Sequence, residues 1–84
     1  MSTIRILFFA ALREQLGAEL AHEIAPGTTV ADVRTALRAR GEPWATLLDA
    51  ARGTRTALNQ ALCGEQATLR PGDELAFFPP VTGG

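Results

Sequence analysis

The 84 residues of this chain suffice for one domain and leave no room for a second domain or a deep catalytic cleft. A content of 46% hydrophobic and 20% charged residues excludes an intrinsically disordered chain. The formal charge is -1, and the arginines are scattered from Arg5 to Arg70, so the clustered cations of a nucleic-acid-binding surface are absent.

A β-strand is predicted over residues 3–9, because β-branched and aromatic residues dominate this segment. Ile4, Ile6 and Phe8 share one parity of the strand, and we expect them to face the core. Side chains on a strand alternate between the two faces of the sheet, so Phe9 is expected to face outward.

Three helices and a second strand follow the first strand. A short helix ended by a glycine is expected over residues 10–16, and a strand over residues 19–24. The main helix, about 11 residues long, begins where Thr29 and Asp32 have the spacing of a capping box. Pro43 is suited to the first position of another short helix. The apolar face of that helix is expected to contain Trp44, Leu47, Leu48 and Ala51.

Two further strands complete the expected fold, one over residues 54–62 and the last over residues 75–78. Only one substantial helix is available to cover the sheet, whereas a doubly wound fold needs helices on both faces. The sequence therefore predicts the α+β class, a small mixed sheet with one main helix packed on one face.

Few side chains are available for catalysis by the chain itself. His22, the only histidine, lies in a predicted strand, and we interpret it as a surface residue. Cys63, the only cysteine, excludes an intramolecular disulfide and a cysteine-based metal site, and is interpreted as a small hydrophobic residue. Asp73 and Glu74 flank a turn, and their solvation there explains them without catalysis. No role is assigned to His22 or Cys63.

The end of the chain carries the most informative pattern. The last predicted strand runs directly into residues 79–84, with the sequence PPVTGG. Consecutive prolines cannot donate hydrogen bonds to a sheet, so a domain of residues 1–78 is expected to end in an extended tail. Terminal glycines leave the α-carboxylate unobstructed, and such a carboxylate needs activation, for example as an acyl-adenylate, before it can be attacked. The alternative is a chain end that only frays.

Strand alternation also predicts an exposed apolar patch beside this tail. If Leu75 and Phe77 face inward, then Phe78 faces outward like Phe9, and Leu62 joins them if its strand lies alongside. Contiguous apolar patches usually mark interfaces, so these residues are expected to form a docking surface. The alternative is that one of them, most readily Leu62, is covered by a loop.

Three segments of the chain carry a family resemblance. They are Leu7-Phe8-Phe9-Ala10 with Arg13-Glu14 and Gly17, then Leu58-Asn59-Gln60, and then PGDELAFFPPVTGG at residues 71–84. In this order they resemble the MoaD family, the small subunits of molybdopterin synthase. The last segment is far more specific than a Gly-Gly end, while residues 19–57 match only in pattern. The resemblance implies a ubiquitin-like β-grasp fold.

The same resemblance implies the chemistry of a sulfur carrier in molybdenum cofactor biosynthesis. Gly84 would be adenylated with ATP by an E1-like activating enzyme, converted to a thiocarboxylate, and used to donate sulfur to cyclic pyranopterin monophosphate. Thr82, Gly83 and Gly84 would insert into the large synthase subunit, in a heterotetramer of two small and two large subunits. Catalytic groups would lie on the large subunit, and this chain would bind no cofactor or metal of its own.

The family's partner contacts fall on four positions of this sequence. Phe9, Leu62 and Phe78 match residues that contribute to partner contacts, and Arg13 matches the arginine that contacts the activating enzyme. The first three form the outward-facing set that strand alternation predicts independently.

Three alternative functions remain open from the sequence. A thiamine-pathway sulfur carrier shares the fold and the Gly-Gly end, but the FFPPVTGG ending argues against it. A ubiquitin-like modifier would use the same adenylated tail, and a binding module would not need the glycines. The first residues lack a signal peptide pattern and no segment has ~18 consecutive apolar residues, so we expect a soluble cytoplasmic protein without a nucleic-acid or membrane partner.

Overall fold

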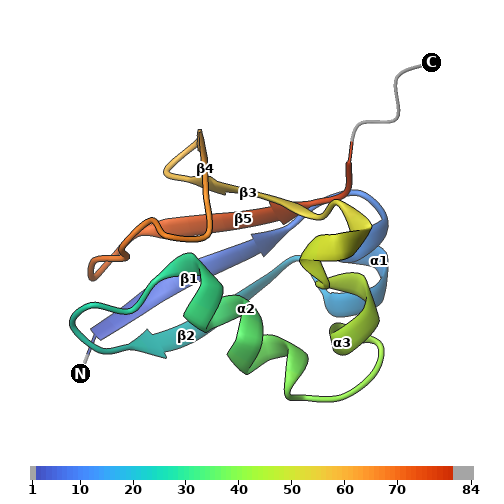
Figure 1. Ribbon diagram of the computed structural model, residues 1–84, viewed down its shortest axis with the longest axis horizontal. Helices are drawn as coiled ribbons and strands as arrows, with labels where there is room; N and C mark the ends of the chain where they lie inside the picture. Colours follow the sequence, from blue (N-terminus) through green and yellow to red (C-terminus); the bar gives the residue numbers. More distant parts are fainter. Residues whose placement is uncertain (1, 81–84) are drawn as a thin grey trace.

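Five strands form one mixed sheet in the computed structural model, which describes residues 2–80 (Figure 1). The strands are β1 (Ser2–Phe8), β2 (Glu19–Ile24), β3 (Arg55–Leu58), β4 (Ala61–Cys63) and β5 (Glu74–Phe78). Their order across the sheet is β2-β1-β5-β3-β4. The central strands β1 and β5 run parallel, and every other neighbouring pair is antiparallel.

Three α-helices and one 3-10 helix connect the strands. They are α1 (Ala11–Leu16), α2 (Val30–Arg38), α3 (Trp44–Leu47) and η1 (Ala50–Arg52). The predicted capping box is confirmed, since the Asp32 N–H donates to Thr29 Oγ1 at 3.2 Å and the Thr29 N–H donates to Asp32 Oδ2 at 2.9 Å. In Figure 1, α2 lies across one face of the sheet, which confirms the expected α+β arrangement.

The hydrophobic core lies between this helix-covered face and α2. Ile4, Ile6 and Phe8 of β1 are at most 2% exposed, so the predicted inward parity is confirmed. The ring of Phe8 stacks on Phe77 at a centroid distance of 5.9 Å and meets Trp44 edge-on at 5.7 Å. The two central strands are thereby packed against each other and against α3.

The prediction of a single strand over residues 54–62 is wrong, because the segment folds as the β3-β4 hairpin. The turn is made by Asn59 and Gln60, whose φ angles of 49° and 72° lie in the left-handed region. Asparagine is common in such two-residue turns, but the second position is usually glycine. Glutamine there removes the sequence signal, so the turn was missed.

The apolar face expected after Pro43 is correct only in part. Leu48 is fully buried, and Trp44 and Leu47 pack against the core. Ala51 is exposed instead, because α3 ends at Leu47 and the chain re-forms as η1, where Asp49 Oδ1 accepts the Ala51 N–H at 2.9 Å.

Two findings concern the described residues as a whole. No helix within residues 2–80 has the length and apolar character needed to cross a membrane. Over the same residues, no three His, Cys, Asp or Glu side chains are grouped as a metal site would require.

Candidate functional site

The root of the tail lies at the end of the central strand β5. Phe78 ends the strand, and the structure continues to the half-buried Pro79 and the exposed Pro80. In Figure 1 this point lies at the same end of the sheet as α1 and opposite the N-terminus. The predicted tail residues Thr82, Gly83 and Gly84 lie outside the described residues.

An apolar row crosses the sheet face that α2 leaves uncovered. The strand register pairs Leu62 with Ala57, Ala57 with Ala76, and Ala76 with Leu7. Directly paired residues point to the same face, and these alternate with core residues such as Leu75 and Phe77. With strands spaced about 4.8 Å apart, the row is roughly 14 Å long.

Two phenylalanines extend this row toward the tail. The Phe9 N–H donates to the Phe77 carbonyl at 3.2 Å, so the ladder between β1 and β5 continues one residue past β1 and brings Phe9 opposite Phe78. Phe9 is 47% exposed and Phe78 is half-buried. We call the whole set the outer apolar patch, consisting of Leu7, Phe9, Ala57, Leu62, Ala76 and Phe78.

The outward orientation predicted for Phe9, Leu62 and Phe78 is confirmed. Leu62 is 71% exposed, and it and Phe9 are the large hydrophobic residues most open to solvent in the described chain. The alternative that a loop covers Leu62 is therefore wrong. Arg13 is also exposed, on α1, at the tail end of the sheet.

Charged residues mark the other limit of the outer apolar patch. Arg5 lies on the same outward-facing side of β1 as Leu7. Its Nε is 3.4 Å from Glu19 Oε2, and its Nη2 is 3.4 Å from Glu74 Oε1. Such exposed ion pairs contribute little to stability. Their effect is to make one end of the outer face polar, so that only the end beside the tail is apolar.

Backbone strain is concentrated beside the two most exposed patch residues. The non-glycine residues with positive φ in the described chain are Ala10, with φ 54°, and the turn residues Asn59 and Gln60. Ala10 directly follows Phe9, and Gln60 precedes Leu62 by two positions. The angles of Asn59 and Gln60 are those of the hairpin turn, whereas Ala10 lies at the start of α1 and belongs to no hairpin. Strained backbone like that of Ala10 is found preferentially at functional sites, which supports a function for the patch beside Phe9.

The Asn59 side chain holds the hairpin in place against β5. Its Nδ2 donates to Asp73 Oδ1 at 3.0 Å, and its Oδ1 accepts the Glu74 N–H at 3.0 Å. The hydrogen bond from Asn59, with a second from the Arg70 N–H, lowers the pKa of Asp73. Asp73 and Glu74 thus have structural partners, in agreement with a non-catalytic interpretation.

His22 and Cys63 have local explanations as well. His22 is half-buried rather than a surface residue, and desolvation together with the charge of Arg40 lowers its pKa. Cys63 is also half-buried, and its Sγ lies 3.4 Å from Thr56 Oγ1. Within the described part of the chain, His22 and Cys63 are not hydrogen-bonded to each other, so they do not form a catalytic pair.

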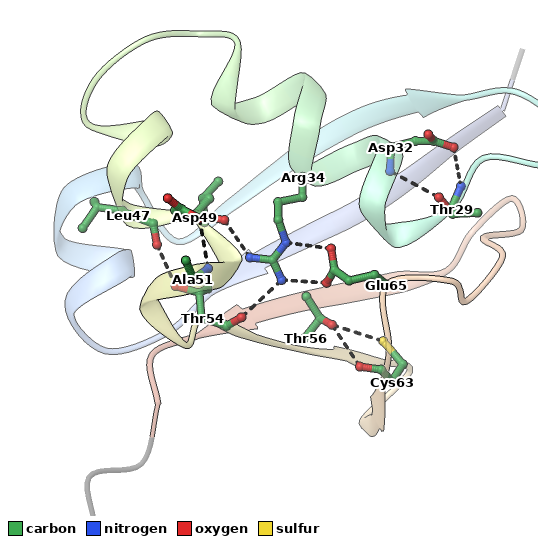
Figure 2. A network of polar contacts seen from close by, with 11 residues as sticks. Thr29, Asp32, Arg34, Leu47, Asp49, Ala51, Thr54, Thr56, Cys63 and Glu65 are labelled. Carbon is green, nitrogen blue, oxygen red and sulfur yellow. Dashed lines mark hydrogen bonds and ion pairs between the residues drawn. The ribbon is translucent and has the colours of Figure 1, made fainter.

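Arg34 is a buried residue whose importance was not predicted (Figure 2). It lies on α2, is 6% exposed, and its Nε and Nη2 donate to the two carboxylate oxygens of Glu65 at 3.0 and 2.9 Å. Nη1 donates to the Leu48 carbonyl at 2.6 Å and Nη2 to the Thr54 carbonyl at 3.2 Å. A signal was present in the sequence, because an arginine four residues after Val30 falls on the apolar face of the helix.

Comparison with known proteins agrees with this geometry. Residues 6–84 match the model of the ThiS family. The chain belongs to the ThiS family. The match extends to Gly84 and so includes the tail beyond the described residues.

Two curated relatives of this ThiS-family chain have nearly the same length. The molybdopterin synthase sulfur carrier subunit of Escherichia coli is 41% identical over 81 residues, covering 96% of this chain and 99% of the relative. The subunit of the same name from Haemophilus influenzae is 38% identical over 81 residues, with the same coverage.

Solved structures show that the ThiS-family fold found here is the ubiquitin-like β-grasp. The HVO 2177 protein of Haloferax volcanii has a TM-score of 0.81 at 28% identity, over 99% of this chain and 87% of its own. A ubiquitin from Caldiarchaeum subterraneum has a TM-score of 0.62 at 25% identity, over 99% and 98%. Helicobacter pylori molybdopterin-converting factor, solved as a complex of subunits 1 and 2, includes a chain with a TM-score of 0.66 at 24% identity, over 98% and 99%.

Proposed function

We propose that this chain is the sulfur carrier subunit of a molybdopterin synthase and works in the cytoplasm. The observation that carries this proposal is the 41% identity to a sulfur carrier subunit over 96% of this chain and 99% of the relative. The relative is covered over nearly its whole length, and the family match over residues 6–84 includes the tail as well as the domain. The outer apolar patch next to the root of the tail provides the docking surface that a carrier needs.

The proposed chemistry takes place at the carboxylate of Gly84. A carboxylate oxygen attacks the α-phosphorus of ATP, pyrophosphate leaves, and an acyl-adenylate forms on the activating enzyme. Sulfide then attacks the acyl carbon and AMP leaves, so that a C–S bond replaces a C–O bond. The thiocarboxylate is the sulfur donor for cyclic pyranopterin monophosphate. ATP belongs to the activating enzyme, and the carrier needs no cofactor or metal.

The proposed partner for the outer apolar patch is the large synthase subunit. Phe9, Leu62 and Phe78 would contact it while Thr82, Gly83 and Gly84 enter its active site. The Helicobacter pylori structure supports such a pairing, since it is a complex of subunits 1 and 2 of molybdopterin-converting factor. A heterotetramer of two small and two large subunits, and an E1-like enzyme that contacts Arg13, complete the proposal.

The test is the intact mass of the full chain after incubation with ATP, an E1-like activating enzyme and sulfide. We expect one oxygen atom to be replaced by sulfur, mapped to Gly84 by fragmentation. The matched control is the chain lacking Gly83 and Gly84, which should keep the circular dichroism spectrum of the full chain and gain no sulfur.

Either of two results would contradict the proposal. An unchanged mass with an activating enzyme that loads a known carrier would favour a plain binding module. Formation of amide-linked adducts to other proteins, without a thiocarboxylate, would favour a ubiquitin-like modifier.

A further inference from the structure

The root of the tail lies beside a second segment of the chain. Phe78, the last residue of β5, is paired with Arg55 at the start of β3. Pro80 lies against Gly53, since a Cβ atom at Gly53 would be 3.3 Å from Pro80 Cβ and 3.3 Å from Pro80 Cγ. Residues 78–80 therefore run antiparallel to residues 53–55. The prolines have no N–H to donate, so this extension of the sheet depends on packing rather than on ladder hydrogen bonds.

Two independent features favour glycine at position 53. Its φ angle is +84°, a conformation that other residues adopt only with strain. A side chain would also come closer to the Pro80 ring than ordinary van der Waals contact allows, because carbon atoms prefer separations of about 3.5 to 4.0 Å. Gly72 has nearly the same φ angle, +82°, but has nothing within 4 Å of its hypothetical Cβ. Contact with Pro80 thus distinguishes Gly53 from a glycine that serves only a turn.

Gly53 lies between two hydrogen-bonded points of the chain, Ala50 before it and the buried Thr54 after it. The Gly53 N–H donates to the Ala50 carbonyl at 3.0 Å, which closes η1. The next residue, Thr54, is 7% exposed; its Oγ1 donates to the Leu47 carbonyl at 2.7 Å, and its own carbonyl accepts from Arg34 Nη2. Figure 2 shows Arg34 reaching Thr54 from α2. The surface that Pro80 meets is therefore anchored to the core.

We propose that Gly53 is a positioning residue whose surface fixes the direction in which the chain leaves the domain at Pro80. Phe78 is held by β3, Pro80 rests on Gly53, and the ring restricts the φ angle of each proline to about -65°. With these constraints the last two described residues have one orientation relative to the sheet. A partner that accepts the tail then orders fewer residues, which lowers the conformational entropy lost on binding.

The consequence for sulfur loading rests on the proposed function, but the orientation itself does not. The contact that sets the orientation is made by Gly53 and Pro80, neither of which belongs to the outer apolar patch. Loss of this contact should therefore affect presentation of the tail while leaving the docking surface intact.

The structural test compares Gly53→Ala with Gly72→Ala in the isotope-labelled full chain. Both substitutions place alanine at a positive φ angle, but only the first pushes against Pro80. In the wild type and in Gly72→Ala we expect a nuclear Overhauser effect between Gly53 and the Pro80 ring, and residual dipolar couplings of Pro79 and Pro80 that fit the alignment of the sheet. In Gly53→Ala we expect the nuclear Overhauser effect between residue 53 and the Pro80 ring to disappear. The couplings of Pro79 and Pro80 should then no longer fit the alignment of the sheet. Absence of the contact in the wild type, or identical behaviour of the two variants, would overturn the proposal.

Pro80→Ala provides a second variant that does not put folding at risk, because Pro80 is exposed. It removes the proline ring from its contact with Gly53 without changing Gly53. The residual dipolar couplings of residues 79 and 80 should therefore no longer fit the alignment of the sheet. Unchanged couplings in Pro80→Ala would show that the ring does not set the direction.

The functional readout is the KM and kcat of the activating enzyme with each full chain as substrate. We expect KM to rise about 3- to 10-fold for Gly53→Ala, with kcat unchanged, because extra ordering is needed only for binding. Gly72→Ala should match the wild type, and equal KM values for the two variants would overturn the role in presentation. Failure of the wild type to accept sulfur would overturn the proposed function instead, while the couplings would still decide the orientation.

Discussion

Gln60 occupies a backbone conformation that glycine would adopt at lower cost. Its φ angle is 72° and its side chain is exposed, so no burial compensates for the strain. We predict that Gln60→Gly raises the free energy of unfolding by about 0.5 kcal/mol, the relief of strain exceeding the greater entropy of glycine in the unfolded chain. Urea denaturation measures this change. Gln66→Gly is the control, since Gln66 is exposed and has no positive φ; it should destabilise the chain, and equal effects at both positions would argue against strain at Gln60.

His22 should make stability depend on pH in the mildly acidic range. Burial and the charge of Arg40 lower its pKa in the folded state, so the unfolded chain binds the proton more readily. The free energy of unfolding should therefore fall as the pH drops below about 6.5 and level off below the folded pKa. Urea denaturation from pH 8 to pH 5 checks this, and His22→Gln should remove the His22 part of the slope. An NMR titration giving a pKa above 6.5 for His22 would contradict the prediction.

Elements that depend on a local pattern were predictable from the sequence, whereas elements fixed by contacts between distant segments were not. Alternation in residues 3–9 and the Thr29 capping box gave β1 and the start of α2 correctly, because each depends on local periodicity or spacing. The β3-β4 hairpin was missed because its turn carries glutamine where glycine is usual, and is held by Asn59 contacts to a strand 15 residues away. Contacts between distant segments of this kind leave no periodic signal.

Arg34 connects α2 to three other segments of the chain, so its removal should cost more than the loss of a single hydrogen bond. Arg34→Met would leave Glu65 and the carbonyls of Leu48 and Thr54 without their donor in a largely buried site. We predict a loss of about 3 kcal/mol in the free energy of unfolding, out of roughly 5 to 10 kcal/mol for a domain of this size. The measurement is urea denaturation at neutral pH.

Arg38→Met on the same helix is the matched control. The Arg38 side chain is 40% exposed, its Nε donates to the Ala45 carbonyl at 2.7 Å, and its ion pair with Asp49 spans 3.5 Å. Its removal should cost about 1 kcal/mol or less, because water replaces the lost partners. Equal losses for the two variants would show that the Arg34 network contributes no more than a surface contact.

On the scale of the whole molecule, the two faces of the sheet differ in what they contact. The face under α2 holds the core, while the outer face is polar around Arg5 and apolar beside the root of the tail. Alternation within single strands predicted the outward direction of Phe9, Leu62 and Phe78. It could not predict that β5 lies between β1 and β3, which is what joins these residues into one patch. That neighbourhood results from long-range pairing, so the sequence analysis could include Leu62 only on the condition that its strand lies alongside.

The outer apolar patch and the tail should therefore be separable by mutation. Phe78→Arg places a charge at the centre of the proposed interface, where binding would strip it of water. We predict that affinity for the large synthase subunit falls by about 2 kcal/mol, roughly 30-fold, with the circular dichroism spectrum unchanged. Calorimetric titration with the purified large subunit measures the loss.

Thr3→Arg is the control for the charge itself, because Thr3 is exposed on the same face of the sheet but at its other end. It should bind the large subunit like the wild type. If Phe78→Arg also binds with unchanged affinity, Phe78 lies outside the interface. If both variants weaken binding equally, net charge rather than the apolar patch controls docking. A loss confined to Phe78→Arg is expected if the outer apolar patch is the docking surface, because only this variant places a charge within the patch.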